Sequence, residues 1–152
     1  MHNSSPILLV EDDLVDARTV ERALKDLNAA NPLNHSIDGE QALEYLRSEG
    51  NKKPSIILLD LNLPKMDGLE LLKAIKADEL LKRIPVVVLT TSKNNEDIVQ
   101  SLELSAAGYM VKPTDYKGFV EMLRTIVSYW SLSELPDFTV EDGKYKVQSL
   151  SS

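Results

Sequence analysis

The sequence of 152 residues contains no cysteine and no long apolar run. The absence of cysteine excludes disulfide scaffolds, cysteine-ligated metal sites and thiol nucleophiles. The first apolar run, Ile7–Val10, is too short for the core of a signal peptide and far too short for a membrane span, which takes about 20 residues. We therefore expect a cytoplasmic protein with no membrane partner.

Positive charge is also scarce. The chain has 17 Lys and Arg residues against 24 Asp and Glu residues, so its formal net charge is −7. This balance disfavours attraction to nucleic acid, and we expect no nucleic-acid partner. Hydrophobic residues make up 43% and charged residues 27%, which is ordinary for a globular protein, and the length suits one domain with a real core.

Short runs of β-branched residues and leucine alternate with longer amphipathic stretches. The runs that we expect to form strands are Ile7–Val10, Leu33–Ile37, Ile56–Leu59, Pro85–Leu89 and Tyr109–Val111. The middle runs are continuously apolar, which is typical of parallel strands that are covered on both faces.

Between these runs, apolar residues recur at the spacing of a helix. The clearest inward face lies in the last helix and comprises Phe119, Val120, Leu123, Ile126, Val127 and Trp130. In the segment 94–106 the pattern is weaker, and the residues expected to point inward are Ile98, Val99 and Leu102. Five strands alternating with five helices predict an α/β fold, a doubly wound five-stranded parallel sheet with right-handed crossovers.

The C-terminal extension, residues 136–152, is too short for a second domain. Pro136 is expected to end the last helix. Asp142–Gly143 is flanked by alternating apolar residues from Phe138 to Val147, which favours a β-hairpin, although a disordered terminus fits equally well.

The apolar residues of this extension exceed the needs of a core. Such a surplus is typical of interfaces, and twofold pairing is the commonest closed assembly. The extension is therefore a candidate dimerisation segment, and we expect a homodimer. The alternative is that it folds back on its own domain and leaves a monomer.

Polar side chains follow the expected strands at their carboxyl ends, where open α/β sheets bind ligands. In chain order these residues are Glu11, Asp12 and Asp13, then Asp60, then Thr90 and Thr91, then Lys112 and Pro113. Carboxylates, a hydroxyl group and an ammonium group are thus expected to meet at one edge of the sheet.

Each of these groups has a chemical use. Asp12 and Asp60 can supply the carboxylate oxygens that Mg²⁺ prefers, and Mg²⁺ with Lys112 would offset their mutual repulsion. An ionised Asp60 can then attack a phosphoryl group, while Thr90 and Lys112 stabilise the developing charge. A carboxylate after a strand is also a common helix cap, and Asp13 is interpreted in that way.

Four blocks of sequence together resemble the receiver domain of two-component response regulators. They are Val10–Asp13, Leu59–Pro64 with Asp67–Gly68, Leu89–Ser92 and Gly108–Pro113. The resemblance places a receiver domain at residues 5–135 and implies the flavodoxin-like strand order 2-1-3-4-5, with helices on both faces of the sheet.

The resemblance also implies roles for single residues. Asp60 matches the phosphoacceptor, and the metal-binding positions are Glu11 (through water), Asp12, Asp60 and Asn62 (through its backbone carbonyl). Thr90 matches the switch hydroxyl, Tyr109 the switch aromatic and Lys112 the lysine that contacts the phosphoryl group. A cis peptide bond is expected between Lys112 and Pro113.

One position departs from the family pattern, and two segments resemble one subgroup of the family. Thr91 stands where the family usually has a small residue, which is expected to narrow access to Asp60. Residues 77–85 and the extension, with Tyr129–Trp130 near its start, are similar to the stand-alone regulators of cyanobacterial phytochromes.

The predicted function is a single-domain response regulator that receives a phosphoryl group from a sensor histidine kinase and signals through protein–protein interaction. The resemblance to regulators of cyanobacterial phytochromes implies a phytochrome as a candidate for that kinase. It would catalyse only its own phosphotransfer and dephosphorylation. The alternative is an adaptor that works without phosphorylation. A phosphatase is disfavoured because Asn62 stands where such enzymes need a second carboxylate.

Overall fold

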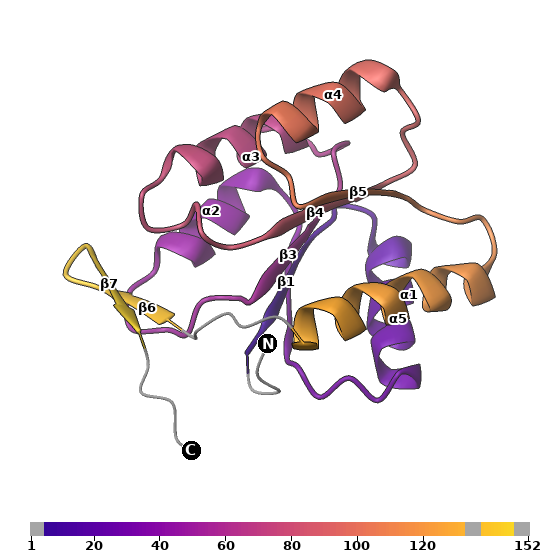
Figure 1. Ribbon diagram of the computed structural model, residues 1–152, viewed down its shortest axis with the longest axis horizontal. Coiled ribbons are helices and arrows are strands. Elements are labelled where there is room, and N and C mark those ends of the chain that lie inside the picture. The colour runs from indigo at the N-terminus through magenta and orange to yellow at the C-terminus, as the bar shows by residue number, and fades with distance from the viewer. Residues whose placement is uncertain (1–4, 133–137, 148–152) are drawn as a thin grey trace.

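The computed structural model describes residues 5–132 and 138–147, and its centre is a five-stranded sheet (Figure 1). The strands are β1 (Ile7–Val10), β2 (Leu33–Ser36), β3 (Ile56–Leu59), β4 (Val86–Thr90) and β5 (Gly108–Val111). They are all parallel and lie in the order β2-β1-β3-β4-β5, so the predicted fold class and strand order are confirmed.

Helices cover both faces of this sheet, as Figure 1 shows. They are α1 (Leu14–Asp26), α2 (Gly39–Arg47), α3 (Gly68–Ala77), α4 (Asn95–Glu103) and α5 (Tyr116–Leu132). Leu8 and Ile57 pack in one apolar core with α2 and α3, whereas Leu9 and Leu58 pack in a second core with α1 and α5. Because both faces of β1 and β3 are buried, these strands are apolar throughout. No helix among the described residues is both long and apolar enough to cross a membrane.

Aspartates fix where the helices that flank the site begin. The Asp13 side chain accepts hydrogen bonds from the backbone N–H groups of Val15 and Asp16, so its interpretation as a helix cap is confirmed. Asp67 caps α3 in the same way, and Gly68 follows it. A Cβ atom on Gly68 would lie 2.5 Å from the Cα of Leu61, so only glycine lets α3 start this close to the end of β3.

The expected inward face of α4 is largely wrong. Val99 and Leu102 are 52% and 55% exposed, Ile98 is half-buried, and the fully buried residue of this helix is Ser101. The more buried positions, Ile98 and Ser101, each come one residue before an exposed apolar residue, Val99 and Leu102. The apolar periodicity therefore marks an exposed surface, which the pattern alone cannot distinguish from a core-facing one.

The C-terminal extension contains a hairpin of β6 (Phe138–Glu141) and β7 (Lys144–Val147). Asp142 and Gly143 both have positive φ, as the type I′ two-residue hairpin turn requires. The hairpin folds back on its own domain: Phe138 and Val140 are buried in the core with α2 and α3. The expected helix end at Pro136 and the domain boundary after residue 135 lie outside the described residues.

Candidate functional site

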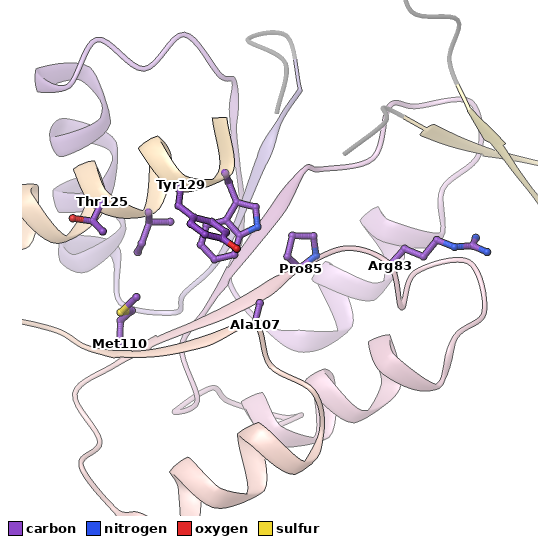
Figure 2. Close-up of a pocket in the computed structure, with 8 residues that line it drawn as sticks. Arg83, Pro85, Ala107, Met110, Thr125 and Tyr129 are labelled. Carbon is purple, nitrogen blue, oxygen red and sulfur yellow. The ribbon is translucent and has the colours of Figure 1, made fainter. Parts of the chain in front are cut away.

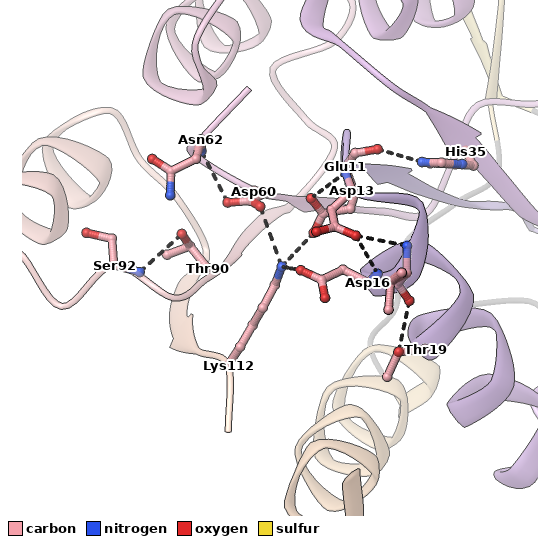
Figure 3. Close-up of polar contacts among 11 residues, drawn as sticks. Glu11, Asp13, Asp16, Thr19, His35, Asp60, Asn62, Thr90, Ser92 and Lys112 are labelled. Atoms are coloured by element: carbon pink, nitrogen blue, oxygen red, sulfur yellow. Dashed lines mark hydrogen bonds and ion pairs between the residues drawn. The ribbon is translucent and has the colours of Figure 1, made fainter. Parts of the chain in front are cut away.

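The carboxyl ends of the strands bring together most of the residues expected at the site (Figure 3). Glu11 follows β1, Asp60 follows β3, Thr90 ends β4 and Lys112 follows β5. The backbone N–H of Asp60 donates to the carbonyl of Val10, which ties the ends of β1 and β3 together. The parallel sheet therefore gathers residues that are up to 101 positions apart in the sequence.

Lys112 is at the centre of this group. Its Nζ atom lies 2.5 Å from Oε1 of Glu11, 3.1 Å from Oδ2 of Asp16 and 3.5 Å from Oδ2 of Asp60. Its side chain is 8% exposed, so these ion pairs are shielded from water more than surface pairs are. The ammonium group thus balances part of a dense negative charge.

Glu11, Asp12 and Asp60 form a cluster in which one oxygen of each lies within 4.8 Å of the others. Glu11 and Asp60 are buried, while Asp12 is exposed at the mouth of the site. Hard carboxylate oxygens at this spacing fit a divalent cation such as Mg²⁺ or Mn²⁺. Because Asp12 is exposed, a cation bound there could take its remaining ligands from water. The backbone N–H of Asn62 donates to Oδ1 of Asp60 at 3.1 Å, which fixes the orientation of that carboxylate.

Burial of Glu11 raises its pKa to about 7. Lys112 opposes this shift through its hydrogen bond and its charge, whereas the neighbouring Asp60 adds to it. Burial of Lys112 works to lower the pKa of its ammonium group, but its contacts with Glu11, Asp60 and Asp16 outweigh burial and raise that pKa. Lys112 therefore stays charged at neutral pH, and Glu11 is the group whose charge is sensitive to its surroundings.

The two expected switch residues meet through Ser92. The hydroxyl of Thr90, which is fully buried, accepts a hydrogen bond from the backbone N–H of Ser92 at 3.3 Å. The hydroxyl of Tyr109 donates to the carbonyl of Ser92 at 2.9 Å, and the Ser92 hydroxyl donates to Asp97 on α4. A movement of Thr90 can therefore reach Tyr109 and α4 through one short loop.

The expected cis peptide bond at Lys112–Pro113 is wrong: no peptide bond among residues 5–132 and 138–147 is cis. Bonds that precede proline still favour trans by about 0.5–1 kcal/mol, so proline alone does not make one cis. Thr91 is exposed and lines a cavity of about 440 Å³ between α1 and the loop that follows β5.

Two residues near the site were missed by the sequence analysis. Asp16 reaches Lys112 from the first turn of α1. His35 on β2 contacts the backbone carbonyl of Glu11 through Nε2 at 2.6 Å. The sequence does show a second acid, Asp16, three residues after the Asp13 cap. Acids are common in the first turn of any helix because they interact favourably with the helix dipole, so the pattern does not indicate a contact with Lys112.

Comparisons with known proteins agree with this geometry. The sequence matches the response regulator receiver domain family over residues 7–124. It is 44% identical over 128 residues to the response regulator Rcp1 of Synechocystis sp., covering 82% of this chain and 87% of that protein. It is also 36% identical over 107 residues to the chemotaxis protein CheY of Pseudomonas aeruginosa, covering 70% of this chain and 83% of that protein.

Solved structures give the same picture. The phosphorylated cyanobacterial phytochrome response regulator RcpA superposes with a TM-score of 0.79 at 41% identity, covering 85% of this chain and 95% of that one. The Mn²⁺-bound form of Rcp1 also gives a TM-score of 0.79, at 43% identity, covering 87% of this chain and 99% of that one. The chain therefore belongs to the response regulator receiver family, whose role in signalling is to carry a phosphoryl group on an aspartate.

Proposed function

We propose that the protein accepts a phosphoryl group on Asp60 from a sensor histidine kinase. The observation that carries this proposal is the convergence of Lys112, Glu11 and Asp12 on the Asp60 carboxylate at the carboxyl edge of the sheet (Figure 3). A carboxylate between a fixed ammonium group and two further acids suits a nucleophile that must stay ionised beside a cation.

In the transfer, an oxygen of Asp60 attacks the phosphorus atom and the bond from phosphorus to the donor's imidazole nitrogen breaks. The electron pair of that bond returns to the imidazole. Lys112 and the hydroxyl of Thr90 would stabilise the charge on the equatorial oxygens. Mg²⁺, when held by Asp12, Asp60, the Asn62 carbonyl and, through water, Glu11, would offset the remaining charge.

The partner that we propose is a kinase of the phytochrome type. RcpA and bacteriophytochrome response regulators, among the structures similar to this chain, support it by their assignment to phytochromes. The Mn²⁺-bound form of Rcp1 supports the binding of a divalent cation by this chain. In this account the protein acts in the cytoplasm and catalyses only its own phosphotransfer and dephosphorylation.

The output would be a protein surface formed by α4, β5 and α5. Its support is the hydrogen-bond path from Thr90 through Ser92 to Tyr109 and α4, together with the exposed Val99 and Leu102 on that helix. The rival function, an adaptor that needs no phosphorylation, does not explain why Lys112, Glu11 and Asp60 are gathered in a buried cluster.

Intact-mass spectrometry after incubation with acetyl phosphate and Mg²⁺ separates the two functions. A response regulator should gain one phosphoryl group. A chelator or Asp12→Asn should strongly slow this gain, because without a bound cation the remaining carboxylates repel the anionic phosphoryl donor. Glu44→Gln, which removes an exposed acid on α2 outside the cluster, serves as the control. No gain in the wild type would favour the adaptor, and a full rate in chelator would refute the role of the metal.

A homodimer is a second proposal, supported by an apolar cavity of about 490 Å³ beside α5 (Figure 2). Pro85, Ala107, Met110 and Trp130 line it, and Tyr129 on its rim is 64% exposed. Phe138 and Val140 of the extension, which was expected to be the dimerisation segment, are buried in the protein's own core and cannot contribute to such a surface. Sedimentation of the wild type and Tyr129→Ser tests the proposal, with Val147→Ser as the control. A monomer at high micromolar concentration in the wild type would refute it.

A further inference from the structure

The contact between Asp16 and Lys112 has no part in the function described above. Asp16 lies in the first turn of α1, and its Oδ2 atom is 3.1 Å from Nζ of Lys112. This contact is shorter than the 3.5 Å between the same Nζ atom and Oδ2 of Asp60. Lys112 is therefore held more closely by Asp16 than by the proposed phosphoacceptor.

The ammonium group of Lys112 has no N–H to spare. It carries three donors, and its three carboxylate partners are Glu11, Asp16 and Asp60. A phosphoryl group on Asp60 would bring new oxygens, and the N–H that now points to Oδ2 of Asp60 can turn to one of them. A second charge-assisted hydrogen bond from Lys112 to the phosphoryl group requires that the contact with Glu11 or with Asp16 be given up.

Asp16 is the partner that can be given up at least cost. Glu11 is 2% exposed, and breaking its pair would leave a buried charge without a partner. The side chain of Asp16 is 43% exposed and borders the 440 Å³ cavity between α1 and the loop after β5. It can turn into water there, and ion pairs of such exposure contribute little free energy.

The geometry points to Asp16 as the residue that holds Lys112 in the unphosphorylated protein and releases it to the phosphoryl group. Asp16 is thus a positioning residue that competes with the phosphoryl group for Lys112 and biases the protein towards its resting state. This inference rests on the proposed function, because it takes Asp60 as the phosphoacceptor.

Binding of beryllofluoride, a phosphoryl analogue, at saturating Mg²⁺ tests the competition. Asp16→Ala should bind it about threefold to fivefold more tightly than the wild type, the size expected for a partly exposed ion pair. Asp16→Asn, which keeps an acceptor oxygen but loses the charge, should fall between them. Glu21→Gln is the matched control: it removes one negative charge from the same helix, where Glu21 pairs with Lys25 rather than Lys112.

Equal or weaker binding by Asp16→Ala, at an unchanged melting temperature, would overturn the inference. An equal gain in Glu21→Gln would assign the effect to net charge and overturn it too. The NMR signal of the Lys112 ammonium group in the unphosphorylated protein gives an independent readout, and it should shift in Asp16→Ala but not in Glu21→Gln. If that signal shifts while the wild type binds no beryllofluoride, the contact stands, and the proposed function fails together with the competition.

Discussion

Glu11 is the residue at which burial and charge conflict most directly. Its carboxyl group is 2% exposed, and burial raises its pKa from 4.5 to about 7 despite the adjacent Lys112. Because the folded protein binds this proton more tightly than the unfolded chain does, Glu11 contributes stability below about pH 4.5. That contribution is lost as the pH rises through about 7. A cation at the site reverses the preference, because it favours the ionised carboxylate.

Mg²⁺ affinity should therefore depend on pH through Glu11. Below pH 7 a proton on Glu11 competes with the cation, so the affinity should rise by about tenfold for each pH unit and level off above pH 7. Titration of Mg²⁺ by NMR from pH 5.5 to 8 measures this. Glu11→Gln should flatten the profile, whereas Glu44→Gln, an exposed acid on α2, should keep it. A flat profile in the wild type would refute the role of Glu11.

Lys112 and Thr90 should link phosphorylation to the output surface. Lys112→Ala and Thr90→Ala are each expected to allow some phosphorylation of Asp60 but to weaken the response of Tyr109, because one contact to the phosphoryl group is lost. The chemical shifts of Tyr109 with and without beryllofluoride measure this response, and Lys93→Ala on the exposed loop is the control. A response equal to that of the wild type in both variants would count against the switch.

Sequence was a good guide to residues whose position follows from a strand end and a poor guide to contacts made by rotamers. Glu11, Asp60 and Lys112 meet because the ends of parallel strands meet. The pair of Asp16 with Lys112 depends on where the packing of α1 against α5 places the first turn of α1, and no local pattern specifies that. The peptide bond at Pro113 is trans although the sequence resemblance implied cis.

Among the elements, β1, β3 and α5 were the easiest to predict. The two strands are apolar at every position, and α5 carries a long apolar face at helical spacing. Helix α4 was not, since Val99 and Leu102 follow a helical period yet face solvent. The β6–β7 hairpin stayed undecided from sequence because four-residue strands carry too little pattern to separate a hairpin from a disordered tail. The structure shows the hairpin, and its β6 strand accepts hydrogen bonds from the backbone N–H groups of Gly50 and Lys53 in the loop before β3.

Those contacts make the hairpin part of the domain's stability. Phe138 is 5% exposed in the core with α2 and α3, and its carbonyl accepts a hydrogen bond from the N–H of Lys53. Phe138→Ala should lower the free energy of unfolding by about 3 kcal/mol, as expected for a buried phenylalanine. Urea unfolding followed by circular dichroism measures it.

The matched control lies on the opposite strand. Val147 pairs with Phe138 in the hairpin but is 54% exposed, so Val147→Ala should change the free energy of unfolding by less than about 0.5 kcal/mol. Equal losses in the two variants would mean that the hairpin does not dock through Phe138. No loss in either would mean that it does not dock at all.

At the scale of the whole molecule, the net charge is −7, and three of the acids lie together at one edge of the sheet. Anions gathered at Asp60 repel one another, and a bound cation offsets this repulsion and keeps the nucleophile ionised. The family match extends over residues 7–124, so it includes every residue of the candidate site.

The central claim is that Asp60 carries the phosphoryl group, and chemical mapping of the modified residue tests it most directly. After phosphorylation with acetyl phosphate and Mg²⁺, borohydride reduces an aspartyl phosphate to homoserine, and peptide mass spectrometry locates the change. The account predicts homoserine at position 60 in the wild type and none anywhere in Asp60→Asn. Homoserine at Asp12 or Asp13 in the wild type, or an equally stable adduct in Asp60→Asn, would contradict it.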